Sequence, residues 1–268
     1  MVKGHPLGYW IDQFVGDGSG ESPEAIQSAL SAMDDRCVRA LIDELNRTPS
    51  PLLEAFDNWK DRLNRGTDPN PESPYRRAGV ALVLGHLGSR ATNAIPALEN
   101  ASRRRMRTPE QGEDIRGAAI AALILIRHDS LDICARKSLD VADPYSGDYR
   151  YAFYRLGTNA TPVIPIFVNA ARTATNFEIK YFAAHSLVWI HRPDLTVPPL
   201  ISMLKQTNNT SRLVATEALA EIRDAAKPAW NDLVVLLNDP DEKVRLSVTN
   251  ALWQIDPAAP QQLKLIQP

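Results

Sequence analysis

The sequence predicts an all-α protein, an α-solenoid (superhelix) of stacked antiparallel helical hairpins, and two observations lead to this fold class. First, five segments repeat one spacing, in which a basic residue is followed by Leu seven positions later and by Leu or Ile ten positions later. Second, offsets of three, seven and ten residues place side chains on one face of a helix. Such self-similarity is typical of repeat architectures, whose stacked units bury a continuous core. The five basic residues are Arg77, Arg116, Lys180, Arg212 and Arg245.

The N-terminal residues are helical but less regular than the repeats. Ser22-Pro23-Glu24 is a favourable helix start, because Ser caps free N–H groups and Pro is tolerated in a first turn. We expect a short helix over 7–14, further helices over 23–33, 35–47 and 50–64, and a loop over 66–74. We interpret residues 1–73 as a divergent N-terminal helical cap.

The repeated segments also carry a small residue or Val three positions after the basic residue: Val80, Ala119, Ala183, Ala215 and Val248. Their starts are 39, 64, 32 and 33 residues apart, so the long gap should contain a degenerate copy. If that copy starts at Ser146, Phe153 and Leu156 take the two apolar positions. The break at Asp143-Pro144 shortens this copy by its first turn.

A second helix follows each repeated segment, and proline often opens it. Proline fits a first helical turn and breaks a helix interior. The expected starts are Ile95-Pro96, Ile164-Pro165, Val197-Pro198 and Lys227-Pro228. The unit is therefore helix, turn, helix, and the chain has room for about six or seven of them.

Two segments resemble the HEAT-repeat family. One is Ile179-Lys180-Tyr-Phe-Ala-Ala-His-Ser-Leu-Val-Trp-Ile190, and the other runs from Val244-Arg245 to Ile255. The turn Asn238-Asp239-Pro240-Asp241 before the second is typical of the bacterial, lyase-like HEAT subtype. The resemblance covers residues 74–258, which we interpret as the repeat array, with 259–268 as a C-terminal tail. It implies a curved solenoid whose second helices line the concave face, and it implies no reaction.

Catalytic motifs do not emerge from the sequence. HEAT-like metal hydroxylases carry paired His-Glu steps, whereas none of the five histidines here precedes Glu. Bilin lyases share the lyase-like repeat, but nothing beyond the repeat points to a bilin. Neither G-x-S-x-G nor a P-loop occurs. We expect no catalytic residue, no metal and no cofactor, and keep a lyase-type enzyme as the third alternative.

A basic ridge is the first candidate binding surface. Residues 76–137 hold 11 basic and 6 acidic side chains, whereas residues 1–75 hold 7 and 13. Arginine suits contact with phosphate or carboxylate, so this ridge could bind a nucleic acid or an acidic segment. The net charge of −2 disfavours a dedicated nucleic-acid binder. The ridge consists of Arg103, Arg104, Arg105 and Arg107.

The degenerate copy is the second candidate surface, because it concentrates aromatic residues that favour binding hot spots. Its candidate residues are Tyr149, Arg150, Tyr154 and Arg155. Our first functional hypothesis is a non-enzymatic scaffold or adaptor that binds a protein or peptide along the concave face. Polyanion binding through the basic ridge is the alternative.

The remaining features concern compartment and redox state. No apolar run is long enough to span a membrane, and the start lacks the apolar core of a signal peptide. Cys37 and Cys134 are far apart in a linear array, so we expect two free thiols. The chain as given favours the cytoplasm, with a removed leader as the alternative.

Overall fold

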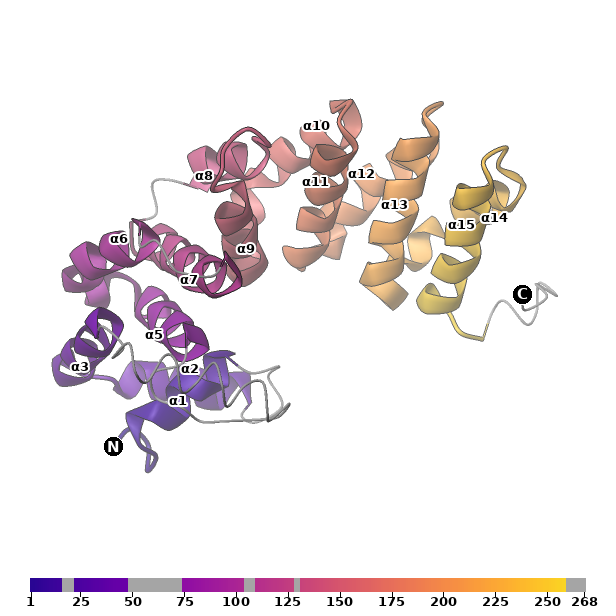
Figure 1. Cartoon of the computed structure of the whole chain (residues 1–268). Coiled ribbons are helices and arrows are strands. Elements are labelled where there is room, and N and C mark those ends of the chain that lie inside the picture. The colour runs from indigo at the N-terminus through magenta and orange to yellow at the C-terminus, as the bar shows by residue number, and fades with distance from the viewer. Residues whose placement is uncertain (16–21, 48–73, 104–108, 128–130, 259–268) are drawn as a thin grey trace, which may run out of the picture. The chain divides into compact units, whose positions relative to one another are not determined.

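A computed structural model describes residues 1–15, 22–47, 74–103, 109–127 and 131–258. Within these ranges the regular structure is helical, apart from one antiparallel bridge between Val2 and His5. The all-α, helical-repeat fold class predicted from the sequence is confirmed (Figure 1). The chain forms two compact units. Unit 1 comprises Met1–Ser130 with Gly147–Arg155, and unit 2 comprises Leu131–Ser146 with Leu156–Pro268.

Unit 1 contains the N-terminal helices and the first two regular repeats. Its elements are α1 (Leu7–Val15), α2 (Pro23–Ala32), α3 (Asp35–Asn46), α5 (Pro74–His86), η1 (Gly88–Ala94), α6 (Ile95–Arg103), α7 (Pro109–Arg127) and α9 (Ser146–Leu156). Ser22 caps α2 by accepting from the Ala25 N–H at 3.2 Å, as its sequence predicts. The helix expected over 50–64 lies outside the described residues.

Close helix packing characterises unit 1. A Cβ atom at Gly85 would lie 2.7 Å from the Ala122 Cα, so this glycine is what lets α5 approach α7. A Cβ atom at Gly117 would lie 2.6 Å from the Tyr151 Cδ1, so α9 packs equally closely on α7. α7 is thus packed closely against both α5 and α9.

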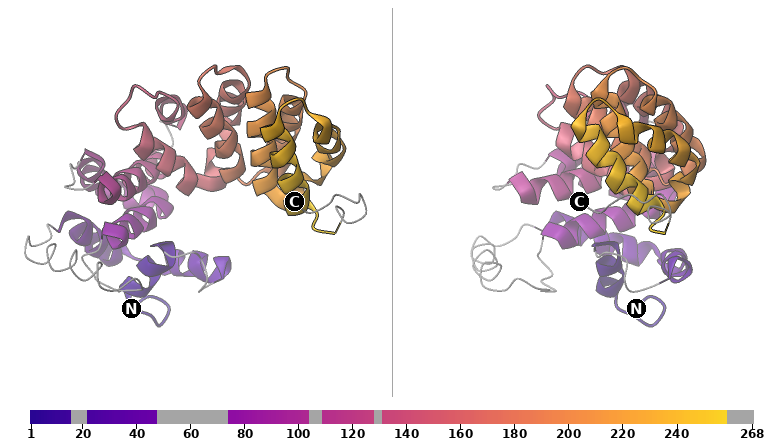
Figure 2. Two further views of the ribbon diagram at one scale, coloured as in Figure 1. Left: turned by 45° about the vertical axis from the view of Figure 1, so that its right-hand side comes forward. Right: turned by 90° about the vertical axis from the view of Figure 1, so that its right-hand side faces the viewer.

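Unit 2 contains three helical pairs in succession. Its elements are α8 (Leu131–Ser138), η2 (Gly157–Val163), α10 (Ile164–Thr173), α11 (Phe177–Trp189), α12 (Pro193–Leu204), α13 (Asn209–Ile222), η3 (Arg223–Ala229), α14 (Trp230–Val235), η4 (Leu236–Asn238) and α15 (Glu242–Ile255). Within this unit α11, α13 and α15 lie side by side in chain order, and each packs on the helix before it (Figures 1 and 2).

The repeated spacing marks the core of both units. The five residues at the third position are fully buried, and the apolar residues at the seventh and tenth positions are buried except for the half-buried Leu123 and Ile222. The degenerate copy is confirmed as α9, in which Phe153 and Leu156 are buried. It has 11 residues, compared with 14 in α13 and in α15.

The basic residues that open the repeats are structural. The Lys180 ammonium donates to the carbonyls of Ala171 at 2.9 Å and Arg172 at 3.3 Å, at the end of α10. Arg212 donates to the carbonyls of Gln206 at 2.9 Å and Thr207 at 2.7 Å, beyond the end of α12. Each cation therefore satisfies carbonyls that the end of the preceding helix leaves unpaired.

Asp239 connects two of these cations. Its carboxylate accepts from Arg212 in a bidentate pair, Nε to Oδ2 at 2.6 Å and Nη2 to Oδ1 at 2.8 Å. Its main-chain carbonyl accepts from Arg245 at 2.7 Å. The hydrogen bond from Arg212 lowers the pKa of the Asp239 carboxyl, which therefore stays ionised in the interior.

The predicted starts of two second helices were wrong. Lys227-Pro228 lie within η3, and α14 begins only at Trp230. α6 and α10 begin at Ile95 and Ile164 as expected, but α12 begins at Pro193, one turn before Val197-Pro198. The Arg192 carbonyl accepts from the N–H groups of Leu195 and Thr196, which closes a first turn there. The second-turn Pro198 is tolerated on the exposed side of the helix. The domain boundaries at 73/74 and 258/259 stay predictions.

Candidate functional site

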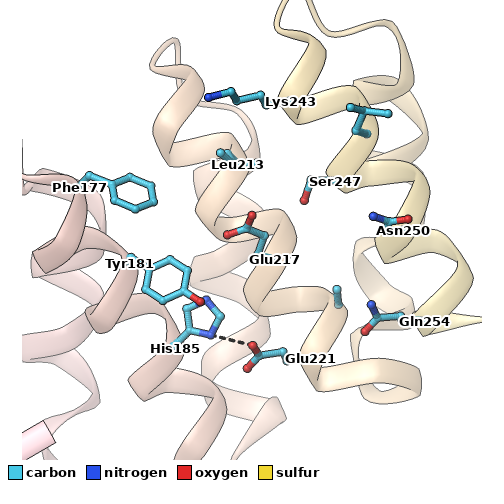
Figure 3. Close-up of a pocket in the computed structure, with 12 residues that line it drawn as sticks. Phe177, Tyr181, His185, Leu213, Glu217, Glu221, Lys243, Ser247, Asn250 and Gln254 are labelled. Atoms are coloured by element: carbon cyan, nitrogen blue, oxygen red, sulfur yellow. Dashed lines mark ion pairs between the residues drawn. The ribbon is translucent and has the colours of Figure 1, made fainter.

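A groove of about 640 Å³ crosses the outer faces of α11, α13 and α15 in unit 2 (Figure 3). Asn176, Asn208 and Asp241 cap the N-termini of the three helices by accepting from main-chain N–H groups. The groove is lined by Phe177, Tyr181, His185, Leu213, Glu217, Ala220, Glu221, Lys243, Leu246, Ser247, Asn250 and Gln254.

The lining residues follow a second spacing within the repeats. Counted from Lys180, Arg212 and Arg245, the first position holds Tyr181, Leu213 and Leu246, which we name the apolar row. The fifth position holds His185, Glu217 and Asn250, which we name the polar row. Because residues four apart lie on one helix face, the two rows run in parallel across the three helices.

Exposed apolar side chains line part of the groove. Phe177 is 52% exposed, Tyr181 40% and Leu246 58%, which is unusual for side chains of this size. The Phe177 and Tyr181 rings stack at a centroid distance of 5.8 Å, so they form one aromatic surface on α11. Contiguous exposed apolar surface of this kind marks interaction sites.

Two carboxylates on α13 give the middle of the groove a negative charge. Burial raises the pKa of the Glu217 carboxyl, the charge of His185 lowers it in part, and the neighbouring Glu221 charge raises it further. Burial also raises the pKa of the Tyr181 hydroxyl, with both carboxylates contributing. Among the described residues that line the groove, Lys243 is the one lysine or arginine, and Figure 3 shows it at the opposite end from Glu221.

His185 lies behind Tyr181 in the groove wall (Figure 3). Its side chain is 4% exposed, and its Nδ1 pairs with the Glu221 Oε1 at 3.0 Å. Its Nε2 is buried and has no hydrogen-bond partner among the described residues. With the proton assigned to Nδ1 by its carboxylate partner, Nε2 of the neutral ring is an acceptor. An unpaired buried polar atom costs about 1–3 kcal/mol, so this nitrogen calls for a functional explanation.

No group of three or more His, Cys, Asp or Glu side chains in the described ranges is arranged to hold a metal ion. The two cysteines are free, as predicted. Burial raises the pKa of the Cys134 thiol to about 11, which keeps it protonated. None of the helices described here is long and apolar enough to cross a membrane.

Of the predicted basic ridge, the structure describes only Arg103, which is exposed at the end of α6. Arg104, Arg105 and Arg107 lie outside the described residues. The ridge stays a prediction.

The predicted aromatic site lies on α9 in unit 1. Tyr154 is exposed, whereas Tyr149, Arg150 and Arg155 are half-buried. The Arg155 guanidinium lies 6.0 Å from the centroid of the Tyr151 ring. Tyr149 and Tyr154 are five residues apart, which places them about 140° apart around a helix. The two tyrosines therefore point in different directions from α9, and their joint role stays a prediction.

The groove was missed at the sequence level, where attention went to second helices and to departures from the repeat. The signal was the pair of aromatic residues Phe177 and Tyr181, which do not occupy the buried third, seventh and tenth positions counted from Lys180. His185 was interpreted as a packed histidine. It is indeed buried, but its unpaired nitrogen could only be seen once the fold was known.

The stacked hairpins place this chain in the class of helical-repeat proteins. Residues 164–253, from α10 into α15, match the model of the HEAT-repeat family. Residues 164–253 therefore carry HEAT repeats, in agreement with the family that the sequence resembles. No curated protein matches it.

Among solved structures, the chain is similar to an engineered protein at 17% identity, covering 84% of this chain and 98% of that one with a TM-score of 0.37. It is similar to a designed armadillo repeat protein at 15% identity, 82% and 100% coverage and a TM-score of 0.35. It is also similar to human deoxyhypusine hydroxylase in complex with glycerol, at 18% identity, 83% and 96% coverage and a TM-score of 0.27.

Proposed function

We propose that this protein is a non-enzymatic scaffold that binds a protein or peptide segment in the groove across α11, α13 and α15. The observation that carries the proposal is the apolar row, in which Tyr181 and Leu246 remain exposed on equivalent positions of different repeats. Large exposed side chains beside polar groups supply what a peptide-binding groove needs, namely apolar anchors and hydrogen-bonding partners.

The dimensions suit a short extended segment. Neighbouring packed helices are about 8–10 Å apart, so three of them span about 16–20 Å. An extended chain advances about 3.3 Å per residue, so about five or six residues cross the groove. Ser247, Asn250 and Gln254 lie along one face of α15 and offer donors and acceptors to the main chain of such a segment.

The test is a selection of random short peptides, displayed on phage, against the whole protein. Synthetic copies of the selected peptides are then titrated by fluorescence anisotropy against Leu246→Asp. We expect at least about a tenfold loss of affinity, because a charge replaces an apolar anchor. Val235→Asp is the matched control, since Val235 is 71% exposed on α14 and does not line the groove. Selection of no peptide, or equal binding to both variants, would overturn the proposal.

Polyanion binding through Arg103 and the adjoining arginines is the second candidate. The net charge of residues 76–137 supports it, with 11 basic against 6 acidic side chains. A polyanion should lose affinity steeply between low and moderate salt, whereas a peptide in the groove should lose much less. Titration of a labelled single-stranded oligonucleotide at two salt concentrations therefore separates the two candidates.

A further inference from the structure

The acid pair on α13 lacks a cation of its own. Glu217 and Glu221 are four residues apart, which places their Cβ atoms about 5–6 Å apart on one face of the helix. Like charges at this spacing destabilise a helix. Glu221 pairs with His185, but Glu217 makes no hydrogen bond or ion pair with any residue of the described ranges. The half-buried Glu217 carboxylate is therefore held without a direct partner, and His185 acts on it through charge alone, which lowers its pKa.

The surroundings of this pair consist of groups that accept hydrogen bonds. The two carboxylates accept, and the unpaired Nε2 of His185 accepts in the tautomer set by Glu221. The Tyr181 ring lies against His185 at a centroid distance of 4.0 Å, with the two ring planes tilted by 35°. Lysine and arginine side chains only donate, which makes them complementary to such a site.

The aromatic ring adds a second attraction for a cation. A cation over a tyrosine ring gains electrostatic stabilisation within about 6 Å of its centroid. Figure 3 shows the Tyr181 ring beside Glu217 and Glu221, with its hydroxyl directed toward His185. Lys243 at the far end repels a second cation there, so the groove has a preferred place for positive charge.

We propose that the groove recognises its peptide through one cationic side chain, lysine or arginine, which docks against Tyr181 between the carboxylates of Glu217 and Glu221. His185 acts as a positioning residue, because its Nδ1 holds the Glu221 carboxylate. This proposal rests on the proposed function, since it names the chemistry that the same groove selects.

The test uses the peptides selected from the displayed library and their variants. Replacing the critical Lys or Arg by Gln should weaken binding at least about tenfold, and Glu217→Gln with Glu221→Gln should do the same, because hydrogen bonds between charged groups are strong. Glu242→Gln is the control, since Glu242 is exposed on α15 and does not line the groove. Thermal unfolding of each variant establishes that it is folded.

A charge exchange gives a sharper readout. Glu217→Lys should abolish binding of the cationic peptide, and a peptide with Glu in place of its Lys or Arg should regain affinity for that variant. If Leu246→Asp abolishes binding while Glu217→Gln and Glu221→Gln leave it within about twofold, the cationic subsite is wrong and the groove function stands. If Leu246→Asp also has no effect, both proposals fail. Equal affinity for free lysine and for the peptide would likewise overturn peptide recognition.

Discussion

The first helices of unit 1 and unit 2 share one buried spacing but differ on their outer faces. In α5 and α7 the first and fifth positions after the basic residue are Ala78, Leu82, Gly117 and Ala121, and all four are buried. In α11, α13 and α15 the same positions form the apolar and polar rows of the groove. The comparison teaches that the spacing of three, seven and ten specifies packing, while the outer positions decide whether a repeat is covered or available to a ligand.

The largest expected effect comes from moving a groove residue into unit 1. Ala121 stands where Glu217 stands in α13, but it is fully buried. Ala121→Glu should lower the free energy of unfolding by about 3–5 kcal/mol, because it buries a carboxylate without a partner. Asn250→Glu, at the exposed equivalent position of α15, should change it little. Urea unfolding of both variants measures the contrast, and similar losses would contradict the comparison.

The next effect concerns the buried basic residue that opens a repeat, taking Arg212 of unit 2 as the example. Asp239→Ala should cost about 3 kcal/mol, since it strands the buried Arg212 guanidinium. Arg192 and Asp194 form a similar bidentate pair on the surface, so Asp194→Ala should matter far less. Because Arg212 lowers the pKa of Asp239, the pair stabilises the fold above the ordinary aspartate pKa. This stabilisation is lost as the pH falls through the lowered pKa, and acid unfolding of Asp239→Asn should lack that component.

A smaller loss of stability distinguishes the two units at the position one residue after the basic residue, Gly117 in unit 1 and Leu213 in unit 2. Gly117→Ala should cost about 1–3 kcal/mol, because the new Cβ would meet the Tyr151 Cδ1 at 2.6 Å and the Asp148 carbonyl oxygen at 2.9 Å. Leu213→Ala, at the same position of α13, removes a half-buried side chain and introduces no clash. Thermal unfolding followed by circular dichroism tests whether only the first variant strains the packing of α7 on α9.

The smallest expected effect has the opposite sign. Since burial and Glu221 raise the pKa of Glu217, the folded state favours the protonated carboxyl, and ionisation of Glu217 weakens the fold as the pH rises. Glu217→Gln should therefore slightly raise the thermal midpoint near neutral pH, with no gain at a pH below the ordinary glutamate pKa. A midpoint that falls for Glu217→Gln at neutral pH would refute this account.

The affinity for a cationic peptide should fall as the pH drops through the raised pKa of Glu217.

The sequence predicted the fold and the core well, because burial at Val80, Ala119, Ala183, Ala215 and Val248 follows from a helical period alone. It predicted the groove poorly, because Glu217 and Glu221 look like an ordinary solvated pair until α11 and α15 are placed beside α13. The start of α12 was predicted one turn late, since the proline pair at 198 and 199 was more conspicuous than Pro193. The roles of Arg103 and Tyr149 depend on what they contact, which periodicity does not specify.

Asp239 has a consequence for how repeats of this protein can be exchanged. Its side chain completes the preceding first helix through Arg212, while its main chain holds the following one through Arg245. If a repeat is excised at the ends of its helices, Asp239 is therefore separated from either Arg212 or Arg245. The transplantable module runs from a basic residue to the aspartate beyond the next hairpin turn, and successive modules overlap. Grafting the groove onto another solenoid thus requires carrying these turns along with α11, α13 and α15.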